Sequence, residues 1–387
     1  MKRITLIVVL LVIVAIIGFQ VITSQQPSPI SASVVGLQAN DSMAGYARAT
    51  QPREFKFPDD HGSHPEYQTE WWYYTGNLDS ADGRHFGYQL TFFRRAITPT
   101  VTSRASDWAT NQIYFAHFAV TDVKNNSHSS TERFSRGAAG LAGATGTPYH
   151  VWIENWSVTS LNADGSNVQL QAEDNGRAIN LTLKSVKPVV LQGDRGLSQK
   201  SSEPGNASYY YSFTRLNTEG TITIDGKTLS VIGNSWMDHE WSTAVLGPNA
   251  VGWDWFSIQL SDNRELMLFQ IRQKDGSVEP LSSGTLVEPD GSTRHLTHDQ
   301  FKIDVKSTWK SNFTGATYPS AWNVAIPSAN IQLALKPYVA DQEMHVSIVY
   351  WEGAVSISGQ SNSGTVNGSG FVEMTGYAPS PNPQPSP

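Results

Sequence analysis

The sequence contains no cysteine among its 387 residues. This absence excludes disulfide bonds, thiolate nucleophiles, cysteine-ligated metals and a lipidated N-terminal cysteine. Charged residues are also scarce at 16%, and the formal net charge is -7 with no long basic run. Binding to nucleic acid needs clustered positive charge, so we do not expect nucleic acid as a partner.

The globular part of the sequence also lacks any segment with a sustained helical period of apolar residues. Gly (31) and Pro (20) are frequent instead, which suits short strands and turns. Alternating segments are separated by Asp-Gly pairs, which are typical of tight hairpin turns: Asp82-Gly83, Asp164-Gly165, Asp225-Gly226, Asp275-Gly276 and Asp290-Gly291. The clearest hairpin spans 221–232 and offers Ile222, Ile224, Leu229 and Val231 to a core. We therefore expect an all-β protein of antiparallel sheets, closed so that no edges remain free.

The length of the chain predicts two domains, because a single hydrophobic core rarely holds together a chain of 387 residues. Segments 70–94 and 253–272 both read as an aromatic strand paired with an apolar strand, which hints at two related barrels. The predicted division is an N-terminal membrane segment at 1–24, a flexible linker at 25–52, domains at 53–242 and 243–377, and a Pro/Ser tail at 378–387.

The N-terminus predicts contact with a membrane. Lys2 and Arg3 precede an apolar run from Ile4 to Ile22, close to the roughly 20 residues that span a bilayer as a helix. A retained anchor is favoured, and a cleaved signal with its site after Ser33 is the alternative. Either way the globular part would lie in the periplasm or outside the cell, and it would be secreted if the segment is cleaved.

Two tryptophan-rich segments, 233–242 and 252–256, hold the candidate chemistry. Residues two apart on a strand share a face, so Met237, His239 and Trp241 face one way while Trp236, Asp238 and Glu240 face the other. Asp254 lies opposite its flanking tryptophans. Burial among indoles would raise the pKa of its carboxyl and make it a usable general acid. The alternative, that Asp254 caps or pairs at a strand end while the tryptophans pack, stays open.

Other catalytic patterns are incomplete. His61 and His64 lack further metal ligands at recognisable spacing, so a loop role is favoured for them. His239-Glu240 lacks the second histidine of a zinc-hydrolase motif, and no G-x-S-x-G serine elbow exists. We expect no metal and no organic cofactor.

Four stretches, 57–76, 236–241, 351–353 and 370–377, resemble the signatures of the carotenoid 1,2-hydratase and AttH family, particularly its branch of predicted secreted hydrolases. The resemblance implies two lipocalin-like β-barrels side by side. Hydratases of the family protonate a terminal alkene with an aspartate close to a His-x-Trp pair. Asp254 is similar to that acid, and His239 and Trp241 match the pair, although Gly252 stands where the family segment has tyrosine.

Together these observations predict a cavity, within or between barrels, that takes a long apolar isoprenoid or lipid ligand. The expected chemistry is acid-assisted water addition, as in a hydro-lyase, or hydrolysis. The candidate catalytic residues are Asp254, His239 and Asp238, and the candidate ligand-binding residues are Trp241, Trp253, Trp255, Trp236, Trp72 and Tyr74. The alternative function is a non-catalytic carrier that works with an ABC-type transport system of the envelope. In that case Asp254 should be bonded to arginine or backbone.

Overall fold

The computed structural model describes residues 43–100, 105–244 and 246–378. These residues form 23 β-strands and the short 3₁₀ helices η1 (Asp59–His61), η2 (His298–Gln300) and η3 (Pro327–Ala329). The predicted all-β class is therefore confirmed.

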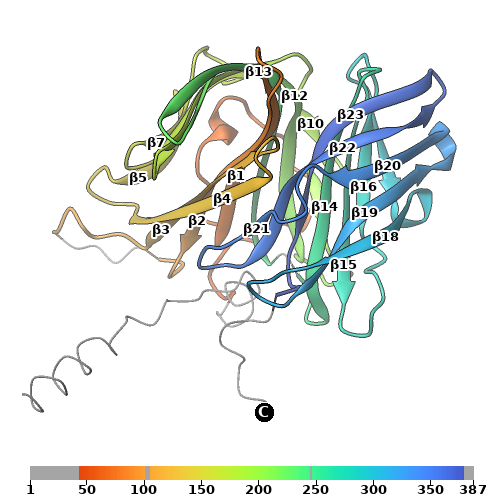
Figure 1. Ribbon diagram of the computed structural model, residues 1–387. Helices are drawn as coiled ribbons and strands as arrows, with labels where there is room; N and C mark the ends of the chain where they lie inside the picture. The colour runs from red at the N-terminus through yellow and green to blue at the C-terminus, as the bar shows by residue number, and fades with distance from the viewer. Residues whose placement is uncertain (1–42, 101–104, 245, 379–387) are drawn as a thin grey trace, which may run out of the picture.

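The strands up to Ala244 form one 13-stranded antiparallel sheet that curls into a nearly closed barrel (Figure 1). Its strand order is β4-β3-β2-β1-β13-β12-β9-β8-β7-β6-β5, and β10 and β11 pair with β12. The strands are β1 (Thr69–Ser80), β2 (His85–Ala96), β3 (Gln112–Asp122), β4 (Ser127–Arg136), β5 (Ala142–Gly146), β6 (Tyr149–Ile153), β7 (Trp156–Ser160), β8 (Asn167–Asp174), β9 (Arg177–Ser185), β10 (Val190–Leu191), β11 (Leu197–Gln199), β12 (Ala207–Ile224) and β13 (Lys227–Ala244).

The remaining strands form a 10-stranded sheet beside the barrel. Its order is β17-β16-β15-β14-β23-β22-β20-β19-β18, and β21 pairs with β22. The strands are β14 (Ala250–Leu260), β15 (Glu265–Gln273), β16 (Ser283–Val287), β17 (Thr293–Thr297), β18 (Lys302–Lys310), β19 (Thr317–Ile326), β20 (Ile331–Pro337), β21 (Glu343–Met344), β22 (Tyr350–Ser361) and β23 (Gly364–Met374).

The second sheet corrects the prediction of two closed barrels, because it is a half-barrel. Its end strands β17 and β18 follow one another in the chain, but the helical turn η2 separates them, and they do not pair within the described residues. Large side chains such as Phe256, Trp322 and Trp351 fill the concave face instead of a second closed lumen. The edge strand β17 is short, which limits the unpaired backbone that the open edge exposes.

The predicted hairpin at 221–232 is confirmed. Asp225 and Gly226 join β12 to β13 with φ of 49° and 77°, and a two-residue type I′ turn requires positive φ at both positions. Ile222, Ile224 and Val231 are buried, as the alternation predicts. The turn chemistry and the apolar alternation thus set the same register.

No helix in the described part of the chain is long and apolar enough to cross a membrane. The predicted anchor at 1–24 and all but one residue of the tail at 378–387 lie outside the described residues. The predicted linker at 25–52 is described only from residue 43. There it packs against the barrel, where Ala49 is buried and the Tyr46 hydroxyl donates to the Ala96 carbonyl (3.0 Å).

The segment 53–68, which includes η1, packs inside the barrel (Figure 1), and side chains of the strands fill the rest of the interior. Phe55 packs edge-on against Trp241 with ring centroids 5.6 Å apart, and Trp72 Nε1 donates to the His61 carbonyl (2.8 Å). A ligand would have to displace this segment to enter the barrel. The space for a ligand is therefore on the outer face, where β1 lies against β23 and β2 against β22.

Candidate active site

A cavity of about 120 Å³ lies between the outer face of the barrel and the second sheet. A single water needs roughly 10–15 Å³ by a comparable measure, so the cavity has room for an organic ligand. Its wall is largely aromatic and includes Trp71, Tyr73, Phe93, Phe115, Trp253 and Trp255. Strand alternation selects these side chains, because Trp71 and Tyr73 of β1 face the cavity while their neighbours face the barrel interior.

Asp238 of β13 lines this cavity and is buried. It accepts three hydrogen bonds, from Ser212 Oγ (2.5 Å) and Trp236 Nε1 (2.7 Å) to Oδ1 and from the Tyr210 hydroxyl (2.7 Å) to Oδ2. Burial raises the pKa of Asp238 to about 7, against the lowering effect of these donors. Asp238 can therefore gain or lose a proton near neutral pH, and its donors favour the ionised form.

Glu373 of β23 reaches the same cavity from the second sheet and is half-buried. Its Oε1 accepts a hydrogen bond from Trp253 Nε1 (2.7 Å). Burial raises the pKa of Glu373 to about 8, and the nearby Glu240 and Asp238 carboxyls add to the effect. Glu373 is therefore protonated at neutral pH and can act as a proton donor inside an apolar cavity.

Glu240, the third carboxyl of the lining, is held as an ion pair. Its Oε1 lies 3.2 Å from Lys200 Nζ and also accepts a hydrogen bond from Ser208 Oγ. The Lys200 ammonium lies 4.1 Å from the centre of the Phe269 ring. The charge of Glu240 is thus balanced, which leaves Asp238 and Glu373 as the two carboxyls of the lining with raised pKa values.

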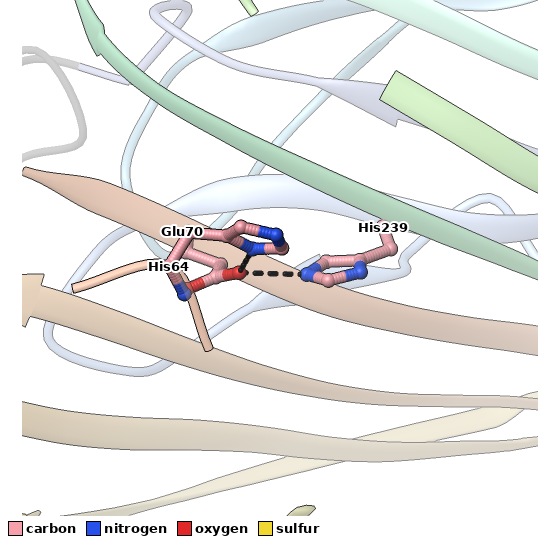
Figure 2. Close-up of side chains that lie close together, drawn as sticks. All are labelled: His64, Glu70 and His239. Atoms are coloured by element: carbon pink, nitrogen blue, oxygen red, sulfur yellow. Dashed lines mark hydrogen bonds and ion pairs between the residues drawn. The ribbon is translucent and has the colours of Figure 1, made fainter. Parts of the chain in front are cut away.

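His239 lies on the opposite face of β13, inside the barrel with Met237 and Trp241, and its ring points toward Glu70 (Figure 2). Glu70 Oε1 bonds both His239 Nε2 (2.9 Å) and His64 Nδ1 (2.7 Å), and Arg94 Nε donates to Glu70 Oε2 (2.8 Å). His64 also contacts Asp60 (3.1 Å) and stacks on the Trp241 ring (3.8 Å). The cluster ties the segment 53–68 to the inner wall of the barrel.

The ligating atoms of His64, Glu70 and His239 lie within 4.8 Å of one another, a spacing at which they could hold a metal ion, but the charged groups around them favour a hydrogen-bonded cluster instead. Although burial lowers it, the Glu70 and Asp60 carboxylates raise the pKa of His64 to about 9. A protonated imidazole has no lone pair for a metal. Arg94 and His64 already balance the carboxylate of Glu70. We therefore assign the cluster to the stability of the barrel.

Asp254 does not line the cavity. Its Oδ1 lies 3.1 Å from Arg272 Nε, and its Oδ2 accepts a hydrogen bond from the Tyr377 hydroxyl (3.1 Å). Burial raises the pKa of Asp254, and Arg272 opposes that effect. Because Trp253 and Trp255 face the cavity, alternation turns the intervening Asp254 toward the interior of the second sheet.

The structure brings three of the residues predicted from the sequence to one cavity: Asp238, Trp253 and Trp255. Trp236 stands behind Asp238 as a hydrogen-bond donor. The barrel interior holds Trp72, Tyr74, His239 and Trp241, so these four do not contact the cavity. They sit one residue away from cavity-facing positions, and the pleat sends adjacent side chains to opposite faces.

Sequence reasoning missed Glu373, Trp71, Tyr73 and Lys200. For Glu373 a signal was present, because it lies in the stretch 370–377 that carries the family resemblance. For Trp71 and Tyr73 the alternation was visible, but nothing in the sequence says which face of β1 meets the second sheet. Lys200 comes from a loop, and no local pattern points to it.

A model of the AttH-like family matches residues 48–377 of this chain. Among solved structures, a protein of Nitrosomonas europaea assigned to AttH is 33% identical with a TM-score of 0.76, and the match covers 86% of this chain and all of that one (100%). Kievitone hydratase from Nectria haematococca is 15% identical with a TM-score of 0.66, covering 86% of this chain and 96% of its own. CghA in complex with Sch210972 is 15% identical with a TM-score of 0.52, covering 87% and 97%. The last two share the fold alone. No curated protein matches this chain.

Proposed function

This chain belongs to the AttH-like family, and on that premise we propose that the cavity between its two sheets binds an apolar, alkene-bearing ligand and adds water to it. The observation that carries the proposal is the pair of carboxyls, Asp238 and Glu373, whose pKa values are raised in an aromatic cavity. Such a pair can supply an acid and a base at the same pH. The name of kievitone hydratase, a relative in fold, is consistent with this chemistry.

The proposed reaction begins with proton transfer from Glu373 to one carbon of the alkene. A C–H bond forms, the π bond breaks, and the other carbon becomes a carbocation, which must be tertiary to form under such mild acid. The faces of Trp71, Trp253 and Trp255 are available to stabilise this cation by up to about 2 kcal/mol when water is excluded. A water molecule then attacks the cation, and its proton passes to the Asp238 carboxylate. An isoprenoid with a trisubstituted alkene meets these requirements.

A direct test is to incubate the purified protein with farnesol, an isoprenoid alcohol with trisubstituted alkenes. Quenching of tryptophan fluorescence reports binding, and mass spectrometry reports any product heavier by one water. We expect both signals, and neither with heat-denatured protein. Farnesol that neither binds nor changes would contradict the proposal.

A non-catalytic carrier is the second candidate, and the environment of Asp254 favours it. The resemblance implies Asp254 as the acid, yet this carboxyl is bonded to Arg272 and Tyr377. A carrier working beside an envelope transport system would bind farnesol and release it unchanged. Binding without hydration would therefore support the carrier.

Asp254→Asn separates the two candidate acids. We expect the variant to hydrate farnesol at a rate close to wild type, because Asp254 does not contact the cavity. Loss of its pair with Arg272 should lower the free energy of unfolding by about 1–3 kcal/mol. Urea denaturation and initial rates measure the two effects. Loss of hydration in a folded variant would return the role of acid to Asp254.

The pH dependence of hydration should be bell-shaped. The active form has Asp238 ionised, which requires a pH above about 7, and Glu373 protonated, which requires a pH below about 8. As the pH increases, activity should therefore rise near the first pKa and fall near the second. The two apparent pKa values belong to the pair of carboxyls as a whole. Initial rates at saturating and limiting farnesol measure the profile. A rate that does not vary across this range would contradict the assignment.

We also propose that the cavity works outside the cytoplasm, with the chain held at the membrane by its N-terminus. Residues 2–22 support this location through their charge and hydropathy. Protease added to spheroplasts of the host should digest the globular part if the membrane segment is retained. Protection from the protease would contradict this location.

A further inference from the structure

His117 of β3 is a fully buried polar side chain in the wall of the cavity, and the proposed reaction does not use it. Burial lowers the pKa of His117 to about 3, so its ring is uncharged at neutral pH. Its Nδ1 bonds the hydroxyl of Tyr350, which also lines the cavity (2.8 Å). Its Nε2 is buried and has no hydrogen-bond partner among the described residues. Because an unpartnered buried polar atom costs free energy, a molecule that bonds this nitrogen would be stabilised.

A second unpartnered atom lies close to this nitrogen. Glu132 Oε1 of β4 accepts a hydrogen bond from the Ser347 amide (2.9 Å), but Glu132 Oε2 is buried without a partner in the part of the chain that the structure describes. This oxygen lies 3.9 Å from His117 Nε2. The distance is too long for a direct hydrogen bond and short enough for one further oxygen atom to bond both groups. The two atoms therefore frame a position for a single oxygen.

The hydrogen bonds of Tyr350 indicate which kind of oxygen fits this position. Gln89 Nε2 donates to the Tyr350 hydroxyl (3.5 Å), which leaves the hydroxyl hydrogen for His117 Nδ1. The ring hydrogen of the neutral imidazole is then assigned to Nε2, which donates, while Glu132 Oε2 accepts. The oxygen between them has to accept one hydrogen bond and donate another. A hydroxyl or a water does both, whereas a carbonyl or an ether oxygen cannot donate.

This position lies at the far end of the cavity from Asp238. Asp238, Tyr73, Thr91 and His117 stand opposite one another on the neighbouring strands β13, β1, β2 and β3, and all four line the cavity. Neighbouring strands lie about 4.8 Å apart, so Asp238 and His117 are separated by roughly 14 Å along the sheet. An extended farnesol has a comparable separation between its hydroxyl and its most distant alkene. A ligand lying along this row can therefore reach both ends.

Resting on the function proposed above, we infer that His117 and Glu132 bind the hydroxyl of an acyclic isoprenoid alcohol and thereby select the alkene that reaches the two proposed catalytic carboxyls. His117 Nε2 donates to the hydroxyl oxygen, and the hydroxyl donates to Glu132 Oε2. The carbon chain leaves the hydroxyl along the aromatic wall, where the rings of Phe93 and Phe115 lie 5.1 and 5.6 Å from the His117 ring. The alkene furthest from the hydroxyl is then the one that gains water.

The position of the added water tests this placement on the wild-type protein. Farnesol carries several trisubstituted alkenes, which differ in their distance from the hydroxyl. We expect the new hydroxyl only at the alkene furthest from the original one, as located by fragmentation of the product in mass spectrometry. Hydration at any other alkene would overturn the placement while leaving the proposed reaction intact.

His117→Phe tests the hydrogen bond itself, because phenylalanine keeps a ring and removes the donor. Tryptophan fluorescence should show farnesol binding about tenfold more weakly than to the wild type, the usual effect of one lost hydrogen bond. Binding of β-farnesene, which has the same carbon skeleton and no oxygen, should not change. The matched control is His128→Phe, which should bind farnesol as the wild type does. His128 Nδ1 also bonds a hydroxyl, that of Thr121 (2.9 Å), and its Nε2 lacks a partner within the described residues, but His128 does not line the cavity.

The comparison of the two ligands separates recognition of a hydroxyl from general damage to the cavity. Glu132→Leu, at a half-buried position, should give the same pattern as His117→Phe and serves as the test if that variant does not fold. Variants that weaken farnesol and β-farnesene equally, or weaken neither, would overturn the hydroxyl site. Failure of the wild type to bind either ligand would contradict the proposed function itself. Binding of farnesol without hydration would contradict only the reaction, and the variants would still decide the hydroxyl site.

Discussion

Glu373→Gln is expected to slow hydration of farnesol by about 10²- to 10⁴-fold, the usual contribution of a positioned general acid. The glutamine keeps an oxygen that can accept the bond from Trp253 Nε1, so the cavity wall should stay in place. What the variant loses is the proton that Glu373 carries because its pKa is raised to about 8. Initial rates measure the loss of activity.

Two measurements make this result specific to the acid. Tryptophan fluorescence should show that the variant still binds farnesol, since an amide leaves the aromatic wall unchanged. The control Glu343→Gln removes a buried carboxyl elsewhere in the second sheet and should hydrate as the wild type does. Equal activity in wild type and Glu373→Gln would remove Glu373 from the mechanism.

Glu70→Ala is expected to have the largest effect on stability, lowering the free energy of unfolding by about 3–5 kcal/mol. The carboxylate is fully buried, and its removal leaves Arg94 and His64 without their common partner. Burial alone would raise the pKa of Glu70, but Arg94, His64 and His239 hold it well below its usual value. The pairing therefore contributes stability at neutral pH, and this contribution is lost as pH falls through the lowered pKa.

Urea denaturation of wild type and variant at neutral pH measures the difference. The matched control is Glu219→Ala, which removes the acid of an exposed ion pair with Lys184 and should change the unfolding midpoint little. A midpoint for Glu70→Ala as high as that of the control would contradict a role for this cluster in stability. Hydration by the folded fraction should persist, because Glu70 does not line the cavity.

The hairpins of this fold could be predicted from the sequence because their signals are local. Asp225-Gly226 fixes a two-residue turn, and the alternation of Ile222, Ile224 and Val231 sets the same register. The extent of closure could not be predicted. Whether β17 meets β18 depends on the path of the chain through η2, and apolar patterning within single strands does not encode that path.

The residues of the candidate site were only partly predictable. Alternation correctly separated Asp238 from His239 and Asp254 from its flanking tryptophans. The sequence could not say which of the two faces meets the other sheet, because both faces of β13 are buried. When one face of a strand is exposed to solvent, polar residues mark that face and apolar residues mark the buried one. When both faces are buried, the sequence no longer shows this difference. Glu373 and Asp238 line the same cavity only because the two sheets, which are far apart in sequence, pack against each other.

Hydration of farnesol in deuterium oxide enriched with heavy oxygen tests the central claim most directly. Proton donation by Glu373 followed by capture of a tertiary cation predicts one deuterium on the less substituted carbon of the former alkene. It also predicts one heavy oxygen on the more substituted carbon, with both labels located by mass spectrometry of the product. A product with oxygen on the less substituted carbon, or farnesol that binds and returns unlabelled, would contradict acid-assisted water addition in this cavity.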